Sequence, residues 1–209
     1  MLYTIFDLET TGFSGTADSV CQFAFMTVNH NLLPVRARNY YFYKEGMSWS
    51  EEAAAVHGLT REFLKQHEKD YEKNLLSMYT VLQRGNLVGH NSNQFDIPFA
   101  RQFLIREGFP PLQPEICYDT MQLWKRHFGK RMKLSNLPAE LGIKESQIHN
   151  LASIMFKDAA GDLRSHNACY DVAATACCLR VAVAKGLCSL QPVPATAEKS
   201  RSARWSEGG

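Results

Sequence analysis

Four acidic residues and one histidine, each beside an apolar run, constrain the fold of this chain more than any other feature. They come from three segments that are far apart in the sequence: Ile5–Gly12 (IFDLETTG), Gly89–Asp96 (GHNSNQFD) and His166–Asp171 (HNACYD). The apolar runs can bury the backbone around these residues, so a compact fold can bring the segments together. Carboxylates at one site repel each other and stay ionised only when cations neutralise them. If the acids meet, Mg²⁺ or Mn²⁺ is the expected partner, because hard divalent cations prefer oxygen ligands.

The bulk properties are those of a compact enzyme. A chain of 209 residues that is 45% hydrophobic can bury one sizeable core, so we expect one domain, at 1–188. Strand-forming residues begin at residue 2, which leaves no signal peptide in view, and no apolar stretch is long enough to cross a bilayer. The six cysteines show no C-x-x-C spacing, which is typical of reduced thiols. We therefore expect a cytoplasmic protein without a membrane partner.

The pattern of apolar residues predicts an α/β fold. Strands are expected at Leu2–Leu8, Val20–Asn29, Val35–Lys44, Asn86–Gly89 and Ile116–Tyr118, the first three as an antiparallel meander. Helices are expected from Ser50 and from Thr60, and over Tyr71–Gln83, Asp96–Glu107, Met121–Phe128, Leu134–Leu141 and His166–Lys185. The segment 189–209 has two prolines and no apolar periodicity, which predicts a disordered tail, with a partner-docking role around Trp205 as the alternative.

The first acidic segment combines two acids with a turn. Asp7 and Glu9 are two positions apart on a strand, so both side chains project from the same face of the sheet. The tripeptide alone is common, but Thr10, Thr11 and Gly12 follow it directly. We expect glycine here to let the backbone approach a ligand closely, with the hydroxyls and amides holding a nucleotide.

The second and third segments carry weaker signals when each is read alone. Asp96 begins a helix, where an acid can simply face the helix dipole. His166 and Asp171 are five residues apart, which on one regular helix separates their directions by about 140°. Both can face one site only if His166 lies on the loop before the helix. Ser165 and Asn167 are suitable capping residues at that boundary.

Taken together, these segments resemble the three motifs of the DEDDh (DnaQ-like) 3′-to-5′ exonuclease family. The segment Ala54–Thr60 (AAVHGLT) is also similar to a segment of this family. Tyr118–Thr120, followed by Lys133–Leu137, is similar to segments of PolC-type exonuclease domains, and the chain as a whole resembles PolC-type and epsilon proofreading exonuclease domains. The sister group has tyrosine four residues before the last acid, where this chain has Asn167. The resemblance covers about residues 2–185 and implies an RNase H-like fold, with a five-stranded mixed sheet flanked by helices.

The resemblance also implies roles for individual residues. Asp7, Glu9, Asp96 and Asp171 would hold two Mg²⁺ or Mn²⁺ ions, Asp96 mainly through bound water, and His166 would accept the proton of the attacking water. The terminal nucleotide would be bound by residues of all three segments and of the AAVHGLT segment, namely Thr10, Thr11, Gly12, His57, Asn91 and Phe95.

The implied activity is hydrolysis of single-stranded nucleic acid, with DNA favoured, from the 3′ end to nucleoside 5′-monophosphates. An RNA-trimming exoribonuclease is one alternative, since no residue decides how a 2′-hydroxyl is received. A proofreading subunit docked on a DNA polymerase, or on another replication or repair protein, is another. The net charge of +2 does not indicate nucleic acid by itself, but five cations within residues 125–133 would suit a phosphate backbone, or simply form a solvated face.

Overall fold

The computed structural model describes residues 2–114, 116–159, 163–188 and 190 of the chain. Its strands are β1 (Leu2–Thr10), β2 (Val20–Asn29), β3 (Pro34–Tyr41), β4 (Asn86–Gly89) and β5 (Ile116–Asp119). Its helices are α1 (Glu51–His57), α2 (Arg61–Lys65), the 3₁₀ helix η1 (Glu68–Asp70), α3 (Tyr71–Arg84), α4 (Asp96–Arg106), α5 (Thr120–Phe128), α6 (Leu137–Glu140), α7 (Glu145–Met155) and α8 (Ala168–Ala184). Apart from Leu190, the predicted tail at 189–209 lies outside the described residues.

The five strands form one mixed sheet in the order β3-β2-β1-β4-β5. β1, β2 and β3 pair antiparallel through short turns, whereas β4 and β5 run parallel to β1 and are joined by α4. β1 is the central strand and pairs with β2 on one side and with β4 on the other. The α/β class and the five-stranded mixed sheet predicted from the sequence are confirmed.

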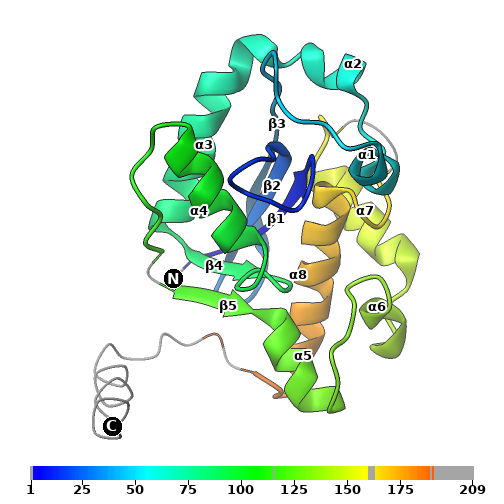
Figure 1. Cartoon of the computed structure of the whole chain (residues 1–209). Coiled ribbons are helices and arrows are strands. Elements are labelled where there is room, and N and C mark those ends of the chain that lie inside the picture. Colours follow the sequence, from blue (N-terminus) through cyan, green and yellow to red (C-terminus); the bar gives the residue numbers. More distant parts are fainter. Residues whose placement is uncertain (1, 115, 160–162, 189, 191–209) are drawn as a thin grey trace, which may run out of the picture.

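Two helical layers cover the two faces of the sheet (Figure 1). α3 and α4 pack on one face, and α8 packs on the other with α7 beside it. Alternation along β1 decides which side chains each layer receives. Phe6 and Leu8 point toward α3 and α4, while Tyr3 and Ile5 point toward α8. Asp7 and Glu9 continue the second series, so they emerge on the α8 face, at the end of the strand.

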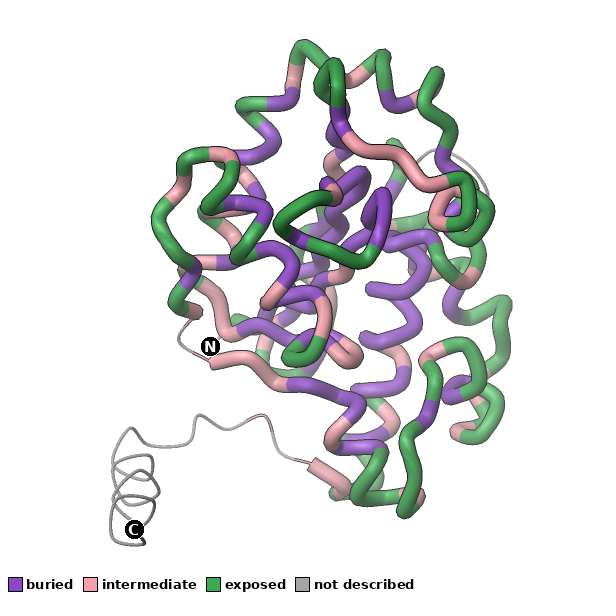
Figure 2. Tube along the Cα trace, in the orientation of Figure 1, coloured by how far each residue is buried: buried purple, intermediate pink, exposed green. Residues whose placement is uncertain are grey.

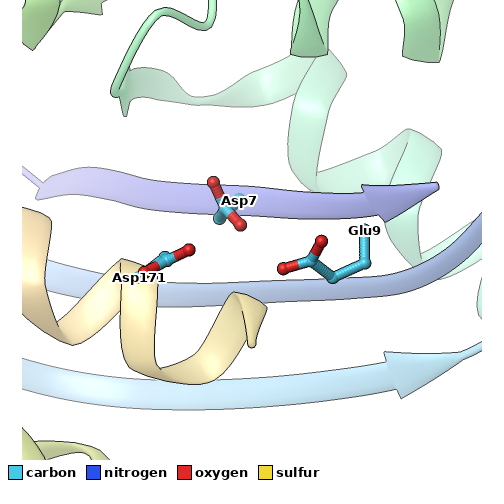
Figure 3. A group of neighbouring side chains, drawn as sticks. All are labelled: Asp7, Glu9 and Asp171. Carbon is cyan, nitrogen blue, oxygen red and sulfur yellow. The ribbon is translucent and has the colours of Figure 1, made fainter. Parts of the chain in front are cut away.

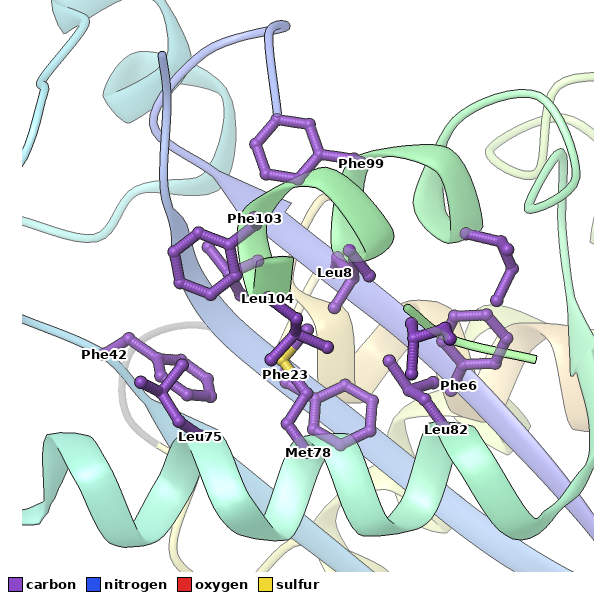
Figure 4. Packing of buried hydrophobic residues seen from close by; sticks show 14 of the residues in the cluster. Phe6, Leu8, Phe23, Phe42, Leu75, Met78, Leu82, Phe99, Phe103 and Leu104 are labelled. Atoms are coloured by element: carbon purple, nitrogen blue, oxygen red, sulfur yellow. The ribbon is translucent and has the colours of Figure 1, made fainter. Parts of the chain in front are cut away.

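The larger core lies between the sheet and the layer formed by α3 and α4. Its side chains include Phe6, Phe23, Leu75, Leu82 and Phe103, none of which is more than 1% exposed (Figure 4). The burial map shows the same division, with buried segments in the sheet and along α8 and exposed ones at the periphery (Figure 2). This rigid support holds β1 in place under the acidic residues at its end.

The observed helices differ from the predicted ones in several places. α7 has no counterpart in the prediction; the Gln147 side chain accepts the Lys144 backbone N–H at its start. The helix expected over Leu134–Leu141 is reduced to α6, because Pro138 lacks a backbone N–H and is tolerated only in a first turn. The last helix begins at Ala168, so His166 lies on the preceding loop, as the geometry of the pair with Asp171 required.

None of the helices in the described part of the chain has both the length and the apolar character needed to cross a membrane.

Leu82 and Leu76 lie on the same helix, α3, and test the contribution of the larger core. Leu82 is fully buried, whereas Leu76 is 58% exposed. We expect Leu82→Ala to lower the free energy of unfolding by about 2–5 kcal/mol, because it removes transfer energy and leaves a cavity. Leu76→Ala should change it by less than about 0.5 kcal/mol. Urea unfolding followed by circular dichroism measures both, and equal losses would contradict the packing described.

Candidate active site

The predicted site residues surround a pocket at the carboxyl end of β1. The first turns of α4 and α8 and one side of α1 complete its wall, and its volume is about 460 Å³. Its lining consists of Asp7, Leu8, Glu9, Thr10, Gly12, Phe13, Ala53, Val56, His57, His90, Asn91, Phe95, Asp96, His166 and Asp171. A second hollow of about 500 Å³ lies beside α8, but Arg180 is its one charged lining residue in the described chain. The predicted site residues therefore line the first pocket and not this hollow.

Three of the four predicted carboxylates meet closely. One oxygen each from Asp7, Glu9 and Asp171 lies within 4.8 Å of the others, and the side chains converge on one space between β1 and α8 (Figure 3). Asp7 and Glu9 are adjacent because they are on the same face of β1, and Asp171 is added by the first turn of α8. An all-oxygen donor set of this density suits a hard divalent cation.

Asp96 stands apart from this group of three. It is buried at the start of α4, and hydrogen bonds from its own backbone N–H and from that of Leu8 favour its ionised form. The contact with Leu8 ties α4 to β1 next to Asp7. Asp96 is close enough to repel the charge of Asp7, which is consistent with a role through bound water.

Burial and mutual repulsion make ionisation of these acids costly. Burial raises the pKa of Asp7 and that of Glu9 well above their usual values, and repulsion from the neighbouring carboxylates adds to the effect. Burial likewise raises the pKa of Asp96 and that of Asp171 to about 7. The cluster is therefore short of positive charge, as a site for cations should be.

The loop before α8 holds His166 next to Asp171. The backbone N–H of His166 donates to Asp171 Oδ2 over 3.1 Å, and this hydrogen bond lowers the pKa of Asp171 against the larger effect of burial. Asn167 caps the helix by accepting the backbone N–H of Cys169 at 3.0 Å. His166 itself adopts a left-handed backbone with φ +66°, a conformation that non-glycine residues rarely take. This turn directs its exposed imidazole to the pocket beside the acids.

Gln22 is a positioning residue that the sequence prediction missed. It lies opposite Glu9 in the β1–β2 ladder and is fully buried. Its carbonyl accepts the backbone N–H of Ala168 at 3.3 Å, while its amide donates to Asn39 at 3.0 Å and to Cys169 Sγ at 3.5 Å. One side chain thus joins the sheet to the first turn of α8. A glutamine inside an otherwise apolar strand was the available sequence signal.

Asp119 plays a similar part for the second motif. Its buried carboxylate accepts the backbone N–H groups of Asn91 at 2.9 Å, Asn93 at 3.2 Å and Met121 at 2.9 Å. Asn91 has a left-handed backbone with φ +63°, so the turn needs such support. The turn brings Asn91, Phe95 and Asp96 to the pocket wall together.

The hydroxyls of the Thr-Thr-Gly turn are engaged within the protein. Thr10 Oγ1 donates to the Gly12 carbonyl at 2.6 Å, and Thr11 Oγ1 accepts the Ser19 N–H at 2.9 Å. Thr11 is buried and is the one predicted site residue that does not line the pocket; the others all do. A Cβ at Gly12 would lie 2.3 Å from the Asp18 carboxylate, so a larger residue at this position would require the Asp18 side chain to move. In this structure the turn offers a ligand its backbone and the side chain that follows, Phe13.

Two aromatic rings of the pocket wall, those of Phe13 and His57, differ in exposure and in hydrogen bonding. Phe13 lines the pocket but is 89% exposed, an unusual position for a phenyl ring, and the sequence prediction did not include it. His57 is buried, which lowers its pKa to about 4 and leaves it neutral near physiological pH. Its Nδ1 accepts the Leu59 N–H at 3.0 Å, so the proton is on Nε2, 3.7 Å from Cys21 Sγ. His57 can therefore meet a ligand with its ring surface more readily than with a free nitrogen.

The fold is that of exonuclease I. A solved structure of exonuclease I superposes with a TM-score of 0.70 at 18% identity, covering 89% of this chain and 42% of that one. The structure of E. coli exonuclease I in complex with a dA16 oligonucleotide also gives 0.70, at 17% identity and with the same coverage. The predicted RNase H-like exonuclease fold is thus confirmed.

Residues 4–179 match the family model described as exonuclease, of the RNase T type, and the chain belongs to this exonuclease family. The PolC-type DNA polymerase III of Mycoplasma pneumoniae is 32% identical over 143 residues, which are 66% of this chain and 10% of that protein. The PolC-type enzyme of Ureaplasma parvum is 29% identical over 122 residues, 58% of this chain and 8% of that one. The chain thus spans about a tenth of the length of these polymerases. The family indicated by the motifs is confirmed.

The raised pKa values of Asp96 and Asp171 predict how stability depends on pH without cations. A carboxyl whose pKa rises from 3.8 to about 7 on folding stabilises the protein fully below about pH 4, and this contribution is lost as the pH rises through about 7. Mg²⁺ or Mn²⁺ should therefore raise Tm more at about pH 8 than at about pH 5. At about 100 times its Kd, a cation should raise Tm by roughly 5–10 °C.

Differential scanning fluorimetry in EDTA and in Mg²⁺ measures both effects. Asp7→Asn removes one charge from the cluster, so it should raise the Tm of the cation-free protein at about pH 8 and diminish the response to Mg²⁺. Asp158→Asn, at an exposed acid outside the pocket, is the matched control and should do neither. A cation-independent Tm at every pH would contradict the metal site.

Proposed function

We propose that this chain is a 3′-to-5′ exonuclease that hydrolyses single-stranded nucleic acid, with DNA favoured, and releases nucleoside 5′-monophosphates. The observation that carries the proposal is the convergence of Asp7, Glu9, Asp171 and His166 on one pocket. Its volume of about 460 Å³ is in the range of small-ligand sites and has room for a single nucleotide. Membership of the exonuclease family supports the assignment.

The acidic cluster is proposed to hold two divalent cations, Mg²⁺ or Mn²⁺. Asp7, Glu9 and Asp171 would hold them directly, and Asp96 would act through water. Bound there, the cations supply an acidified water and neutralise charge on the leaving 3′-oxygen. The carboxylates fit this role because burial, and then repulsion from neighbouring carboxylates, raises the pKa of Asp7 and that of Glu9, so their ionised forms need compensating charge.

His166 is proposed as the general base. Removal of a proton from the attacking water requires a positioned base, and histidine is the side chain that most often has this role. The hydrogen bond from its backbone to Asp171 keeps it next to the acids, while its exposed side chain stays accessible to substrate and solvent. This placement requires the unfavourable left-handed backbone conformation at His166.

The terminal nucleotide is proposed to lie between the Thr10–Phe13 turn and the wall formed by His57, Asn91 and Phe95. Backbone groups of Thr10 and Gly12 would contact the 3′-terminal sugar, and Thr11 would support them from within. The exposed ring of Phe13 is placed to stack on a base. Stacking on an aromatic ring tolerates any base, so we expect weak sequence preference.

The two kinds of relative bear on the substrate and the partner. A solved exonuclease I structure with a bound dA16 oligonucleotide has this fold, which favours single-stranded DNA over the RNA-trimming alternative. The sequence relatives are polymerases, which supports association with a DNA polymerase as a second possibility. Digestion of labelled single-stranded DNA, RNA and a 3′-mismatched duplex distinguishes the substrates, and co-purification with a polymerase tests the association.

The first test concerns cations and the polarity of digestion. A 5′-labelled oligonucleotide should shorten stepwise from its 3′ end in Mg²⁺ or Mn²⁺, and excess EDTA should abolish the reaction, because the acids cannot act without compensating charge. Asp7→Asn and Asp171→Asn should have nearly no turnover, while Asp158→Asn should match the wild type. A bulky 3′ group should block hydrolysis. Efficient cutting of circular single strands would contradict the assignment.

The second test concerns His166. Removal of a general base typically costs about 10²–10⁴-fold in rate, so His166→Ala should lose single-turnover rate in that range and retain cation and substrate binding. Part of the rate should return as pH rises from about 6 to 9, because hydroxide becomes more abundant. His149→Ala, at an exposed histidine on α7, is the control. A near-wild-type rate at neutral pH would remove His166 from the mechanism.

A further inference from the structure

A cationic segment, Lys125–Lys133, lies outside the pocket and takes no part in the chemistry described. Its five cations are all exposed: Lys125, Arg126, Lys130, Arg131 and Lys133. No aspartate or glutamate occurs between residues 120 and 139. Within the described parts of the chain, none of the five is in an ion pair. The segment therefore presents positive charge that the protein does not neutralise.

The cationic segment is anchored rather than loose. Trp124 and Met132, on either side of the bend, are buried in the cluster that joins α5 to α8. Between them Gly129 adopts a left-handed backbone with φ +69°, which ends α5 and reverses the chain. The chain then returns beside α5 (Figure 1), so both parts of the segment belong to one edge of the molecule.

Two hydrogen bonds join this segment to the wall of the pocket. Arg131 Nη2 donates to Gln94 Oε1 at 2.9 Å, and Gln94 immediately precedes the pocket residues Phe95 and Asp96. The Met132 carbonyl accepts Nε2–H of His90, another pocket residue, also at 2.9 Å. Arg131 is thus directly behind the rim of the pocket, while Arg126 is near Cys188, beyond the other end of α8. The cations therefore extend from the pocket wall toward the far end of α8.

Among the described residues, the pocket offers no lysine or arginine to a phosphate. Its acids are proposed to be neutralised by the bound metal ions. A strand whose 3′-terminal nucleotide occupies the pocket carries one negative charge per nucleotide beyond it. Lysine and arginine are the side chains suited to such phosphates, and an uncompensated run of them adjoins the pocket wall at His90 and Gln94.

We propose that the cationic segment binds the phosphates of the substrate strand immediately upstream of the 3′-terminal nucleotide, with Lys130 and Arg131 taking those nearest the pocket. This inference rests on the proposed function, because it assumes that a single strand ends in the pocket. It predicts that strand length and salt govern affinity through this segment, while the acids and His166 govern the chemical step.

Binding is tested without hydrolysis by fluorescence anisotropy of 5′-labelled dT12 in EDTA at several salt concentrations. Lys130→Ala/Arg131→Ala should weaken binding by about tenfold at low salt. It should also reduce the slope of log affinity against log salt by about 1.4, or 0.7 for each lost phosphate contact. Lys69→Ala/Lys73→Ala, which removes the same charge from η1 and the start of α3, should change neither.

Steady-state hydrolysis in Mg²⁺ separates this inference from the proposed function. Lys130→Ala/Arg131→Ala should raise KM for dT12 by about tenfold and leave kcat unchanged, whereas hydrolysis of dT2 should be unaffected. Gln94→Ala removes the contact with Arg131 but keeps its charge, so its salt slope should equal that of the wild type. A wild type that binds dT12 as expected but does not hydrolyse it would refute the proposed function alone.

The inference is overturned if the double variant binds dT12 with the affinity and salt slope of the wild type. That result is expected if the cationic segment serves an acidic protein partner. It is overturned equally if dT2 and dT12 lose hydrolysis to the same degree, since this would place Lys130 and Arg131 in contact with the terminal nucleotide.

Discussion

The burial of several neighbouring carboxylates is the constraint on which the rest of this structure depends. Burial raises the pKa of Asp7, Glu9 and Asp171, and repulsion from the neighbouring carboxylates, Asp96 among them, raises the pKa of Asp7 and that of Glu9 further. Such an arrangement is unfavourable in the absence of cations, so the surrounding fold must hold it in place. The large apolar cores on both sides of β1 stabilise the fold enough to tolerate it.

Buried polar side chains carry out the local positioning. Gln22, on β2, connects the sheet to the start of α8, and Asp119, on β5, holds the turn before α4, so each side chain fixes one motif relative to the sheet. Two left-handed residues, Asn91 and His166, stand at the points where the chain turns into the site. Their conformations are costly, and the hydrogen bonds around them explain how they are maintained.

Charge divides the proposed function between two neighbouring surfaces. The pocket gathers acids and, in the described part of the chain, has no lysine or arginine in its lining, while the cationic segment beyond His90 and Gln94 carries no acid. A site for metal ions and a site for phosphates require opposite charges, and placing both in one pocket would let them neutralise each other. The separation is consistent with a strand whose end meets the metal ions and whose backbone meets the cations.

The sequence alone determined the acids, the histidine and the class of fold. The two-residue spacing puts Asp7 and Glu9 on one face of a strand, and the five-residue spacing of His166 and Asp171 requires the helix to begin between them; both follow from local geometry. Only the tertiary structure decided which side chains support these residues. Contacts between segments distant in sequence decided the role of Gln22 and the position of the cations beside the pocket. The tertiary structure also showed that the Thr10 and Thr11 hydroxyls are used internally and that Phe13 is exposed. Local periodicity carries no information about such contacts, because they are set by how the layers pack.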